Sequence, residues 1–434
     1  MGKAIKVFLC FVVVNFYFFS TTFFFTRGIN TKQIMAVLGI VLFFIDMFRR
    51  KEFAISREFV GLLIYSGLIS LMAVFTYIYH NTFDRTYTDY FMSMLTWLSA
   101  SYVAVRCVKS VHGKLSIELL SAYIIGISVV QGLIAVIADL YTPLGDFIIS
   151  LVPGLRWCRI IDRLFGFGDM ATLDTGGIRF ALASVLCANN IKIAIEKEAT
   201  KSIPLYILAF LIITITGNMV ARTTIVGSFV GLGYLLLFTF PFEGSLKVGV
   251  FRTWLWIIME TLAVFLIMAA LYNSDEQFHQ RTRFGFEGFF SLIEKGHWQT
   301  GSNDALKAMY VFPDNAKTWI IGDGYFISPN RDENYIGETM TGYYMNTDVG
   351  YLRFIFYFGI IGLAIYSLYI IYAGKSCMRL NPGNNFFFLA LTSMNFLIWL
   401  KVATDCFFIL CLFICLGYVK NGMEQIEGID EMEE

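Results

Sequence analysis

Residues 348–373 read DVGYLRFIFYFGIIGLAIYSLYIIYA, and this stretch decides the fold class. It contains only two charged side chains, Asp348 and Arg353, and both lie near its start. About 20 mostly apolar residues are enough to cross the hydrocarbon core of a bilayer as a helix. The stretch is therefore predicted to be a transmembrane helix with an acid and an arginine at one end.

The rest of the chain is also rich in apolar residues. Of its 434 residues, 57% are hydrophobic and only 15% are charged, and the mean hydropathy is +0.65. Soluble globular proteins carry about 25% charged residues, so the composition indicates an integral membrane protein. It excludes a disordered chain and a secreted disulfide scaffold. The basic and acidic residues are equal in number, 33 each, which argues against a nucleic-acid partner.

We predict an all-α fold, a polytopic membrane helix bundle of about twelve spans. The first span begins after Lys3 and Lys6; its apolar run is longer than the core of a signal peptide and has no small-residue cleavage site, so we expect it to be retained. The spans are expected near residues 4–25, 34–49, 58–79, 88–108, 117–140, 177–195, 203–217, 222–240, 252–272, 348–373, 384–400 and 402–420.

The orientation of the spans follows from the basic residues of the short loops, which favour the cytoplasmic side. If the spans alternate, the loops near 50–57, 106–116, 192–202 and 374–383 all fall on one side. Both termini are then predicted to be cytoplasmic. The basic residues of these loops are Arg49, Arg50, Lys51, Arg57, Arg106, Lys109, Lys114, Lys192, Lys197, Lys201, Lys375 and Arg379.

Two longer segments are predicted to be external. Segment 273–347, about 75 residues long, is large enough for a small subdomain, and long external segments often carry recognition or chemistry. The predicted organisation is helices 1–9 in residues 1–272 with an external interfacial segment at 141–176, a large loop subdomain at 273–347, helices 10–12 at 348–420 and an acidic tail at 421–434.

The external segment 141–176 contains the sequence LRWCRIIDRL at 155–164. As a helix it would place Trp157, Ile160, Ile161 and Leu164 on one face, with arginines on the opposite face. Such a helix lies in the membrane interface, either as an ordinary membrane anchor or as a site that attracts an anionic headgroup. The arginines are Arg156, Arg159 and Arg163.

Three arginines lie at the predicted external ends of spans: Arg179, Arg222 and Arg353. One arginine near a helix end can reach water by itself, but three at a similar depth suggest a shared cavity for an anion. Arginine suits phosphate because its planar guanidinium group donates two parallel hydrogen bonds and stays charged. Arg281 and Arg283 lie in the large loop, and we expect them to contribute to the same cavity.

An acid accompanies these arginines. Asp348 directly precedes a span, where it is either a helix N-cap or a general base that takes a proton from a substrate hydroxyl. If Asp348 is the base, Thr347 is available as the cap. The other external candidates for the base are His279, His297, Asp304, Asp323 and Glu338.

Motifs for other chemistries are missing from the sequence. There is no GxxxxGK[ST], HExxH or GxSxG pattern, and no cluster of histidines or acids with metal-ligand spacing. Glu260 and Asp405 are acids within predicted spans, which a proton-coupled transporter would use. A single hydrogen-bonded acid inside a bundle is the simpler interpretation of each.

Four stretches carry a family resemblance: RLFGFGDMATLDTGGIRFALA at 163–183, ITGNMVARTTIVG at 215–227, WIIGDGYF at 319–326 and NTDVGYLRFIFYFGIIGL at 346–363. The pattern of Gly-x-Gly, a variable loop, and then Asp-x-Gly-Tyr-x-Arg before an aromatic-rich span resembles the O-antigen polymerase (Wzy) family. This family belongs to the wider O-antigen ligase and polymerase group of bacterial envelope proteins. Ligases of the group typically have a histidine near the position of Asp348, so the resemblance favours a polymerase.

The resemblance implies a multi-spanning glycosyltransferase of the inner membrane that polymerises undecaprenyl-diphosphate-linked oligosaccharide repeat units at the periplasmic face. Arg179, Arg222, Arg353 and Arg283 would then bind the diphosphate, and Asp348 would be the base. No cofactor or metal is expected, because the arginines supply the positive charge. The implied partners are the lipid-linked oligosaccharide, the lipid bilayer and a separate protein that regulates chain length.

Two alternatives stay open at the level of the sequence. An O-antigen ligase would transfer the finished glycan to another acceptor. A flippase for the same lipid-linked oligosaccharide belongs to a different class, and twelve spans suit a transporter equally well. Transporters often consist of two related halves, and the sequence shows no matching repeat.

Overall fold

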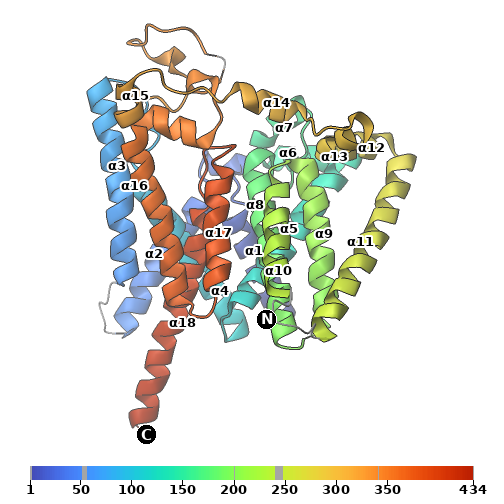
Figure 1. Ribbon diagram of the computed structural model, residues 1–434. Helices are drawn as coiled ribbons and strands as arrows, with labels where there is room; N and C mark the ends of the chain where they lie inside the picture. The colour runs from blue at the N-terminus through green and yellow to red at the C-terminus, as the bar shows by residue number, and fades with distance from the viewer. Residues whose placement is uncertain (1, 51–55, 200, 240–247, 341, 434) are drawn as a thin grey trace. The chain divides into compact units, whose positions relative to one another are not determined.

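The computed structural model describes residues 2–50, 56–199, 201–239, 248–340 and 342–433, and these residues form helices without a named β-strand (Figure 1). The all-α class is therefore confirmed. Eight of the helices are long and apolar enough to cross a membrane, as a membrane protein requires. These helices are α2 (Thr31–Arg50), α3 (Arg57–His80), α4 (Tyr90–His112), α5 (Ile117–Leu140), α8 (Leu173–Glu196), α9 (Ile203–Val220), α11 (Val248–Ser274) and α16 (Gly350–Leu380).

Helices also occupy the other four places at which spans were predicted. They are α1 (Lys3–Phe18), α10 (Thr224–Thr239), α17 (Asn385–Ile398) and α18 (Phe407–Glu433). Helix α1 ends at Phe18, well before residue 25, because polar side chains then compete for the backbone. The Thr21 hydroxyl donates to the Phe19 carbonyl at 3.0 Å, and the Thr21 N–H donates to Thr31 Oγ1 at 3.0 Å.

The chain forms two compact units. Unit 1 consists of Met1–Met35 and Val103–Trp298, and unit 2 consists of Ala36–Tyr102 and Gln299–Glu434. The division falls inside the segment 273–347, which was predicted to be one loop subdomain, so its first part belongs to unit 1 and its second part to unit 2.

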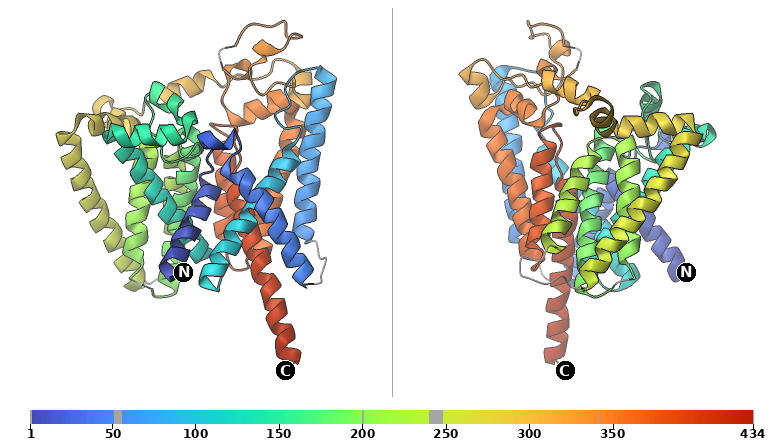
Figure 2. Two further views of the ribbon diagram at one scale, coloured as in Figure 1. Left: turned by 180° about the vertical axis from the view of Figure 1, so that it is seen from behind. Right: turned by 45° about the vertical axis from the view of Figure 1, so that its right-hand side comes forward.

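Helix α8 forms the centre of unit 1 and packs on α5, α9 and α10 (Figure 1 and Figure 2). Helix α10 comes close to α8 at Gly227, where a Cβ atom would overlap the backbone of Ala181. Contacts of this kind between small residues are typical of membrane helices. As a result, 83% of the apolar window of α8 is buried.

Short helices cover the end of unit 1 that lies opposite the N-terminus (Figure 1). They are α6 (Thr142–Leu151), α7 (Arg156–Ile160), α12 (Glu276–Gly285) and α13 (Glu287–Lys295). The helix expected over 155–164 is shorter than predicted because Asp162 adopts the left-handed conformation, with φ of 53°. Trp157 and Ile160 are exposed, as an interfacial segment requires, but Leu164 is buried.

Helix α16 forms the centre of unit 2 and packs on α3, α15 (Ala316–Ile321), α17 and α18. The structure differs from a continuous helix over 348–373, because Phe358 and Gly359 have non-helical backbone angles. Gly359 has φ of 69°, and a Cβ atom there would overlap the backbone of Ile320. The helix therefore has a short first part and a long second part, and Arg353 lies in the first. A further short helix, α14 (Gly301–Ala308), precedes α15.

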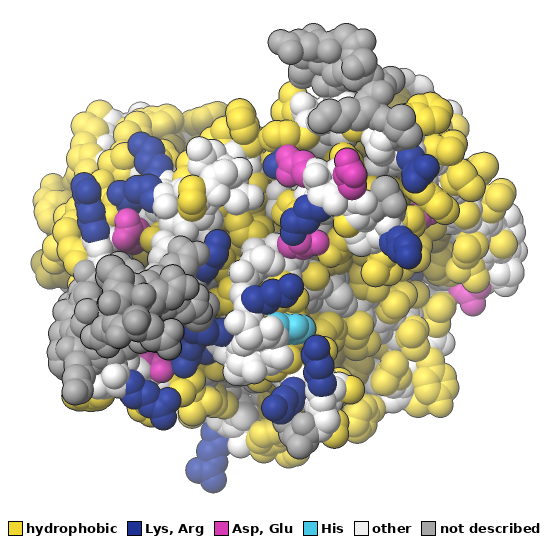
Figure 3. All heavy atoms as spheres, turned by 90° about the horizontal axis from the view of Figure 1, so that it is seen from below, with side chains coloured by type: hydrophobic (Ala, Val, Ile, Leu, Met, Phe, Trp, Pro, Cys, Tyr) yellow, Lys and Arg dark blue, Asp and Glu magenta, His cyan; other side chains and the backbone are white. Residues whose placement is uncertain are grey.

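Basic residues lie at one end of each unit. In unit 1 this end holds the N-terminus and the connections from α4 to α5 and from α8 to α9 (Figure 1). In unit 2 it holds the last residues of α2 and α16 and the first residues of α3. Figure 3 shows lysine and arginine side chains distributed over the face that is seen from below in the view of Figure 1.

Candidate functional site

The break in α16 creates a docking place for the segment after α15. Carbonyl groups near a break lose their helical donors and need new ones. The Asp323 N–H donates to the Phe356 carbonyl at 2.6 Å, and the Gly324 N–H donates to the Tyr357 carbonyl at 3.1 Å. Gly322 permits this approach, since a Cβ atom there would overlap the Tyr357 backbone. The sequence GDGYF is thereby fixed against the first part of α16.

Arg353 is held between two aromatic rings. Its guanidinium carbon lies 3.4 Å from the centroid of the Tyr343 ring and 3.8 Å from that of the Phe326 ring. Its Nη2 donates to the Phe326 carbonyl at 3.1 Å. The residue is only 5% exposed, and within the described part of the chain its Nε has no hydrogen-bond partner. A buried guanidinium with an unused donor is costly on its own, and an anionic ligand would satisfy it.

Asp348 lies beside this arginine. Its Oδ1 is 3.5 Å from Nη1 of Arg353, and its side chain is 34% exposed. The N-cap position of α16 is Val349, and Thr347 Oγ1 accepts the Val349 N–H at 3.3 Å. The acid is therefore positioned between a buried cation and solvent, where it can meet a substrate hydroxyl.

A second acid, Asp323, lies in the same segment. Its carboxylate accepts the Thr318 hydroxyl at 2.7 Å and the Tyr344 hydroxyl at 3.2 Å. Burial raises the pKa of Asp323, although these two hydrogen bonds act in the opposite direction. Tyr343 and Tyr344 are consecutive, so one dipeptide contacts both Arg353 and Asp323.

Two further acids hold the segment in place, and sequence reasoning missed Asp84 and Asp332 entirely. Asp84 accepts the backbone N–H groups of Phe326 at 2.7 Å and Ile327 at 2.9 Å. Asp332 accepts the Tyr325 hydroxyl at 2.8 Å. The only sequence signal for Asp84 was an acid two residues before a threonine in a short loop, a pattern common in ordinary turns.

Arg222 lies in unit 1, in the turn just before α10. It forms an ion pair with Glu287 and stacks on the Phe284 ring, with its guanidinium carbon 4.5 Å from the centroid. Arg163 stacks on the same ring at 4.2 Å. Burial and the charge of Arg222 both lower the pKa of Arg163. The structure therefore brings Arg222 together with Arg163, the last arginine of the predicted interfacial segment.

Arg281 and Arg283 have separate partners in unit 1. Arg281 forms ion pairs with Asp139 at 2.9 Å and with Asp162 at 2.5 Å, next to a polar pocket of about 230 Å³. Arg283 pairs with Glu294 at 2.8 Å. These acids neutralise both arginines within unit 1.

Arg179 is a buried residue of α8 with backbone partners. Its Nε donates to the Phe18 carbonyl, and its Nη1 donates to the Thr175 carbonyl at 3.0 Å. The first bond connects α8 to the end of α1 and the second lies within α8, so both give Arg179 a structural role. The two histidines also have neighbours: His279 stacks on Tyr272 at 3.9 Å, and His297 Nδ1 lies 3.1 Å from the Lys295 carbonyl.

The predicted site residues are thus distributed over both units. Asp348 and Arg353 lie side by side in unit 2, whereas Arg179, Arg222 and Arg283 belong to unit 1 and have three different sets of partners. Among the described residues, no group of three or more histidines, cysteines or acids is arranged to hold a metal ion. No family model, curated protein or solved structure matches the chain.

Proposed function

We propose that this chain is a membrane glycosyltransferase that polymerises undecaprenyl-diphosphate-linked repeat units into O-antigen or a related surface polysaccharide. The pairing of half-buried Asp348, just before the broken helix α16, with buried Arg353 on its first part carries the proposal. It joins an acid that reaches solvent to a buried guanidinium whose Nε has no hydrogen-bond partner among the described residues. The resemblance to O-antigen polymerases lies in the same stretch of sequence, and it favours this reaction over other uses of an acid and an arginine.

Arg353 would bind the diphosphate of the donor. When the bond between the anomeric carbon and the diphosphate oxygen breaks, negative charge grows on the leaving group. A guanidinium fixed by two rings and removed from water stabilises that charge more in the transition state than in the ground state. Tyr343 and Phe326 restrict the orientation of the guanidinium before substrate binds.

Asp348 would act as the general base. Its carboxylate takes the proton of an acceptor hydroxyl as that oxygen forms a bond to the anomeric carbon, and undecaprenyl diphosphate leaves as the anion. The proton lost by the acceptor is thus held on Asp348 and later released to solvent. No electron donor or acceptor takes part in the step.

Arg222 and Arg283 are proposed as further diphosphate ligands, as the resemblance implies. Of the two, Arg222 has the geometry that suits this role better, because it is grouped with Arg163 on Phe284. For Arg179, the same proposal requires that it exchange its bonds to the Phe18 and Thr175 carbonyls for a ligand.

For the membrane topology we propose twelve spans in the inner membrane, with both termini in the cytoplasm and the site in the periplasm. The support is that a helix overlaps each predicted span, and that the face drawn in Figure 3 carries many lysine and arginine side chains. The first part of α16, with Arg353, belongs to the opposite end of unit 2 (Figure 1).

The direct test is reconstitution of the purified chain with lipid-linked repeat units extracted from a strain that lacks its own polymerase. The wild type should produce a ladder of polymer on a gel. The Arg353→Ala variant should lose at least 100-fold in rate, and the matched control Arg85→Ala should not. Arg85 is an exposed arginine of unit 2 that also stacks on a tyrosine, Tyr77. If the wild type forms no ladder, the polymerase proposal is wrong.

Deletion of the gene separates the rival classes. Loss of a polymerase leaves single repeats on the lipid A core, since the ligase still acts. Loss of a ligase leaves long polymer on the lipid carrier, and loss of a flippase leaves no repeats at the surface. Only the first phenotype agrees with the proposal.

A further inference from the structure

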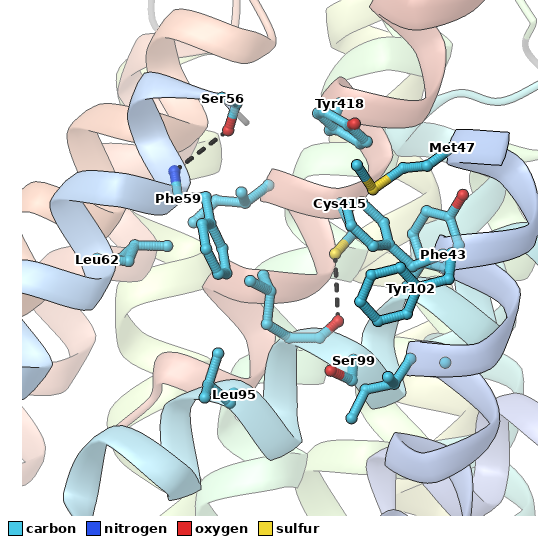
Figure 4. Close-up of a pocket in the computed structure, with 15 residues that line it drawn as sticks. Phe43, Met47, Ser56, Phe59, Leu62, Leu95, Ser99, Tyr102, Cys415 and Tyr418 are labelled. Atoms are coloured by element: carbon cyan, nitrogen blue, oxygen red, sulfur yellow. Dashed lines mark hydrogen bonds between the residues drawn. The ribbon is translucent and has the colours of Figure 1, made fainter. Parts of the chain in front are cut away.

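Unit 2 contains a cavity of about 450 Å³ (Figure 4). Neither Asp348 nor Arg353 lines this cavity. Four helices line it: α2, α3, α4 and α18. Figure 4 shows Phe59 and Leu62 of α3 facing Phe43 and Met47 of α2 across the open space. The cavity is comparable in volume to a pocket for a small ligand.

The walls of this cavity are apolar. Two of the polar groups that line it have partners in the protein: Tyr102 donates to Asp46 Oδ2 at 2.5 Å, and the Ser56 hydroxyl accepts the Phe59 N–H at 3.2 Å. The Cys415 thiol is within 3.5 Å of the Leu98 carbonyl, as the dashed line in Figure 4 shows. A hydrocarbon chain fits such a lining, because a polar ligand would lose its hydration without finding new hydrogen bonds.

The cavity opens towards the apolar outer surface of unit 2. Phe44 is the connecting residue, since it lines the cavity and is still 48% exposed. The neighbouring side chains on α2 and α3, such as Val41 and Ile64, are exposed and apolar. Both helices are long and apolar enough to cross a membrane, so a lipid tail can enter sideways from the bilayer.

Positive charge lies at one end of the cavity. Arg49 follows the lining residue Met47 by two positions, and Arg57 directly follows the lining residue Ser56. Both arginines are exposed, and in the part of the chain that the structure describes neither has an ion-pair partner. The nearby acid Glu58 pairs with Arg379 at 3.6 Å. Basic residues beside a pocket between membrane helices are typical of sites for anionic lipid headgroups.

We propose that this cavity holds one acyl chain of an anionic phospholipid, with the lipid phosphate at the end that carries Arg49 and Arg57. The charge of the two arginines matches that of the phosphate, and the apolar cavity matches the tail. The proposal does not depend on the glycosyltransferase function, because it uses none of the residues of that site.

Photolabelling in nanodiscs tests the proposal with the full chain. The probes are phosphatidylglycerol and phosphatidylcholine that carry the same diazirine-modified acyl chain. On α3, Leu62 lines the cavity and is 0% exposed, whereas Leu71 faces outward and is 66% exposed. Phosphatidylglycerol should label Leu62 several-fold more than phosphatidylcholine does, and both lipids should label Leu71 equally. No label on Leu62, or equal labelling of Leu62 by the two lipids, would overturn the proposal.

Variants identify the parts of the proposed site. Arg49→Gln and Arg57→Gln should each lower labelling of Leu62 by phosphatidylglycerol about fivefold, whereas the exposed control Arg85→Gln should not. Leu98→Trp should abolish labelling of Leu62 and preserve that of Leu71; Cys415→Phe is a second filling variant if the first does not fold. Unchanged labelling of Leu62 in a folded filling variant would refute occupation of the cavity. A dimer in the wild type that is lost in both filling variants would assign the cavity to a second copy of the chain instead.

Discussion

Asp348 Oδ1 lies 3.5 Å from Nη1 of Arg353, although one residue is largely buried and the other reaches solvent. The two residues are five positions apart, on either side of the start of α16. The first part of this helix is separated from the rest by the break at Gly359. A short helical piece that is fixed by its neighbours can hold an acid and a cation in one arrangement before substrate arrives.

Replacement of Arg353 by lysine tests whether the planar guanidinium matters. An ammonium group keeps the charge but cannot stack between Tyr343 and Phe326 or donate two parallel hydrogen bonds. We expect Arg353→Lys to reduce the polymerisation rate about 100-fold, measured with reconstituted protein and lipid-linked repeats. The Arg85→Lys control should remain active. Wild-type activity of Arg353→Lys would exclude a role for the planar shape of the guanidinium group.

Replacement of Asp348 by asparagine tests the general base. An amide of the same shape cannot accept the proton of the acceptor hydroxyl, so we expect the rate to fall by about 10² to 10⁴-fold. Binding of the lipid-linked donor should change much less, because Arg353 remains in place. The measurement is a single-turnover rate beside a donor-binding curve. An Asp348→Asn variant with full activity would leave the acid a purely structural role.

The buried carboxyl group of Asp323 leads to a prediction about how stability depends on pH. Burial raises its pKa in the folded protein, so the folded state holds this proton more tightly than the unfolded state does. The resulting contribution to stability is fully present below the ordinary pKa of an aspartate and is lost as the pH rises through the raised value. We therefore expect the wild type to gain thermal stability relative to Asp323→Asn as the pH falls from 7 to about 4.

The exposed residue Glu333, also between α15 and α16, supplies the control for this experiment. Melting temperatures of the three proteins in detergent, followed by tryptophan fluorescence, give the comparison. Glu333→Gln should leave the pH dependence seen in the wild type in place. If the difference between wild type and Asp323→Asn is constant with pH, the carboxyl of Asp323 does not titrate differently in the folded state.

Much of the helical framework could be predicted from the sequence, because apolar length alone selects it. The predicted span 117–140 coincides with α5, and 203–217 lies within α9. Local backbone chemistry was harder to predict. The end of α1 depends on a hydrogen bond between Thr21 and Thr31, which are ten residues apart. The break at Gly359 depends on the approach of Ile320, which no periodicity in the sequence reveals.

The candidate site could be predicted only in part, for a related reason. Asp348 and Arg353 were found because charges at the end of an apolar run are conspicuous. The two rings that hold Arg353 could not be predicted, because Tyr343 and Phe326 are two aromatic residues among 44 Phe and 23 Tyr in the chain. Contacts over long sequence separation, such as Asp84 with Phe326, require the folded structure.

The ion pairs of Arg281 lead to the last prediction, which concerns the stability of unit 1. It forms two hydrogen bonds with Asp139, at 2.9 and 3.0 Å, and it also pairs with Asp162. The Asp139 side chain is only 15% exposed, so Arg281→Ala would leave a largely buried charge without its partner, at a cost of about 3 kcal/mol. The control Arg159→Ala breaks an exposed pair with Asp146 and should cost less than about 1 kcal/mol.

Two further measurements distinguish a lost ion pair from general damage to unit 1. The double variant Arg281→Ala with Asp139→Asn removes the unpaired charge and should recover part of the stability lost in Arg281→Ala. The hydrogen bond and charge of Arg281 also lower the pKa of Asp162, so this contribution is present above the ordinary aspartate pKa and disappears as the pH falls through the lowered value. The gap in melting temperature between wild type and Arg281→Ala should therefore narrow below about pH 4. Equal losses for Arg281→Ala and Arg159→Ala would contradict the special role given to Arg281.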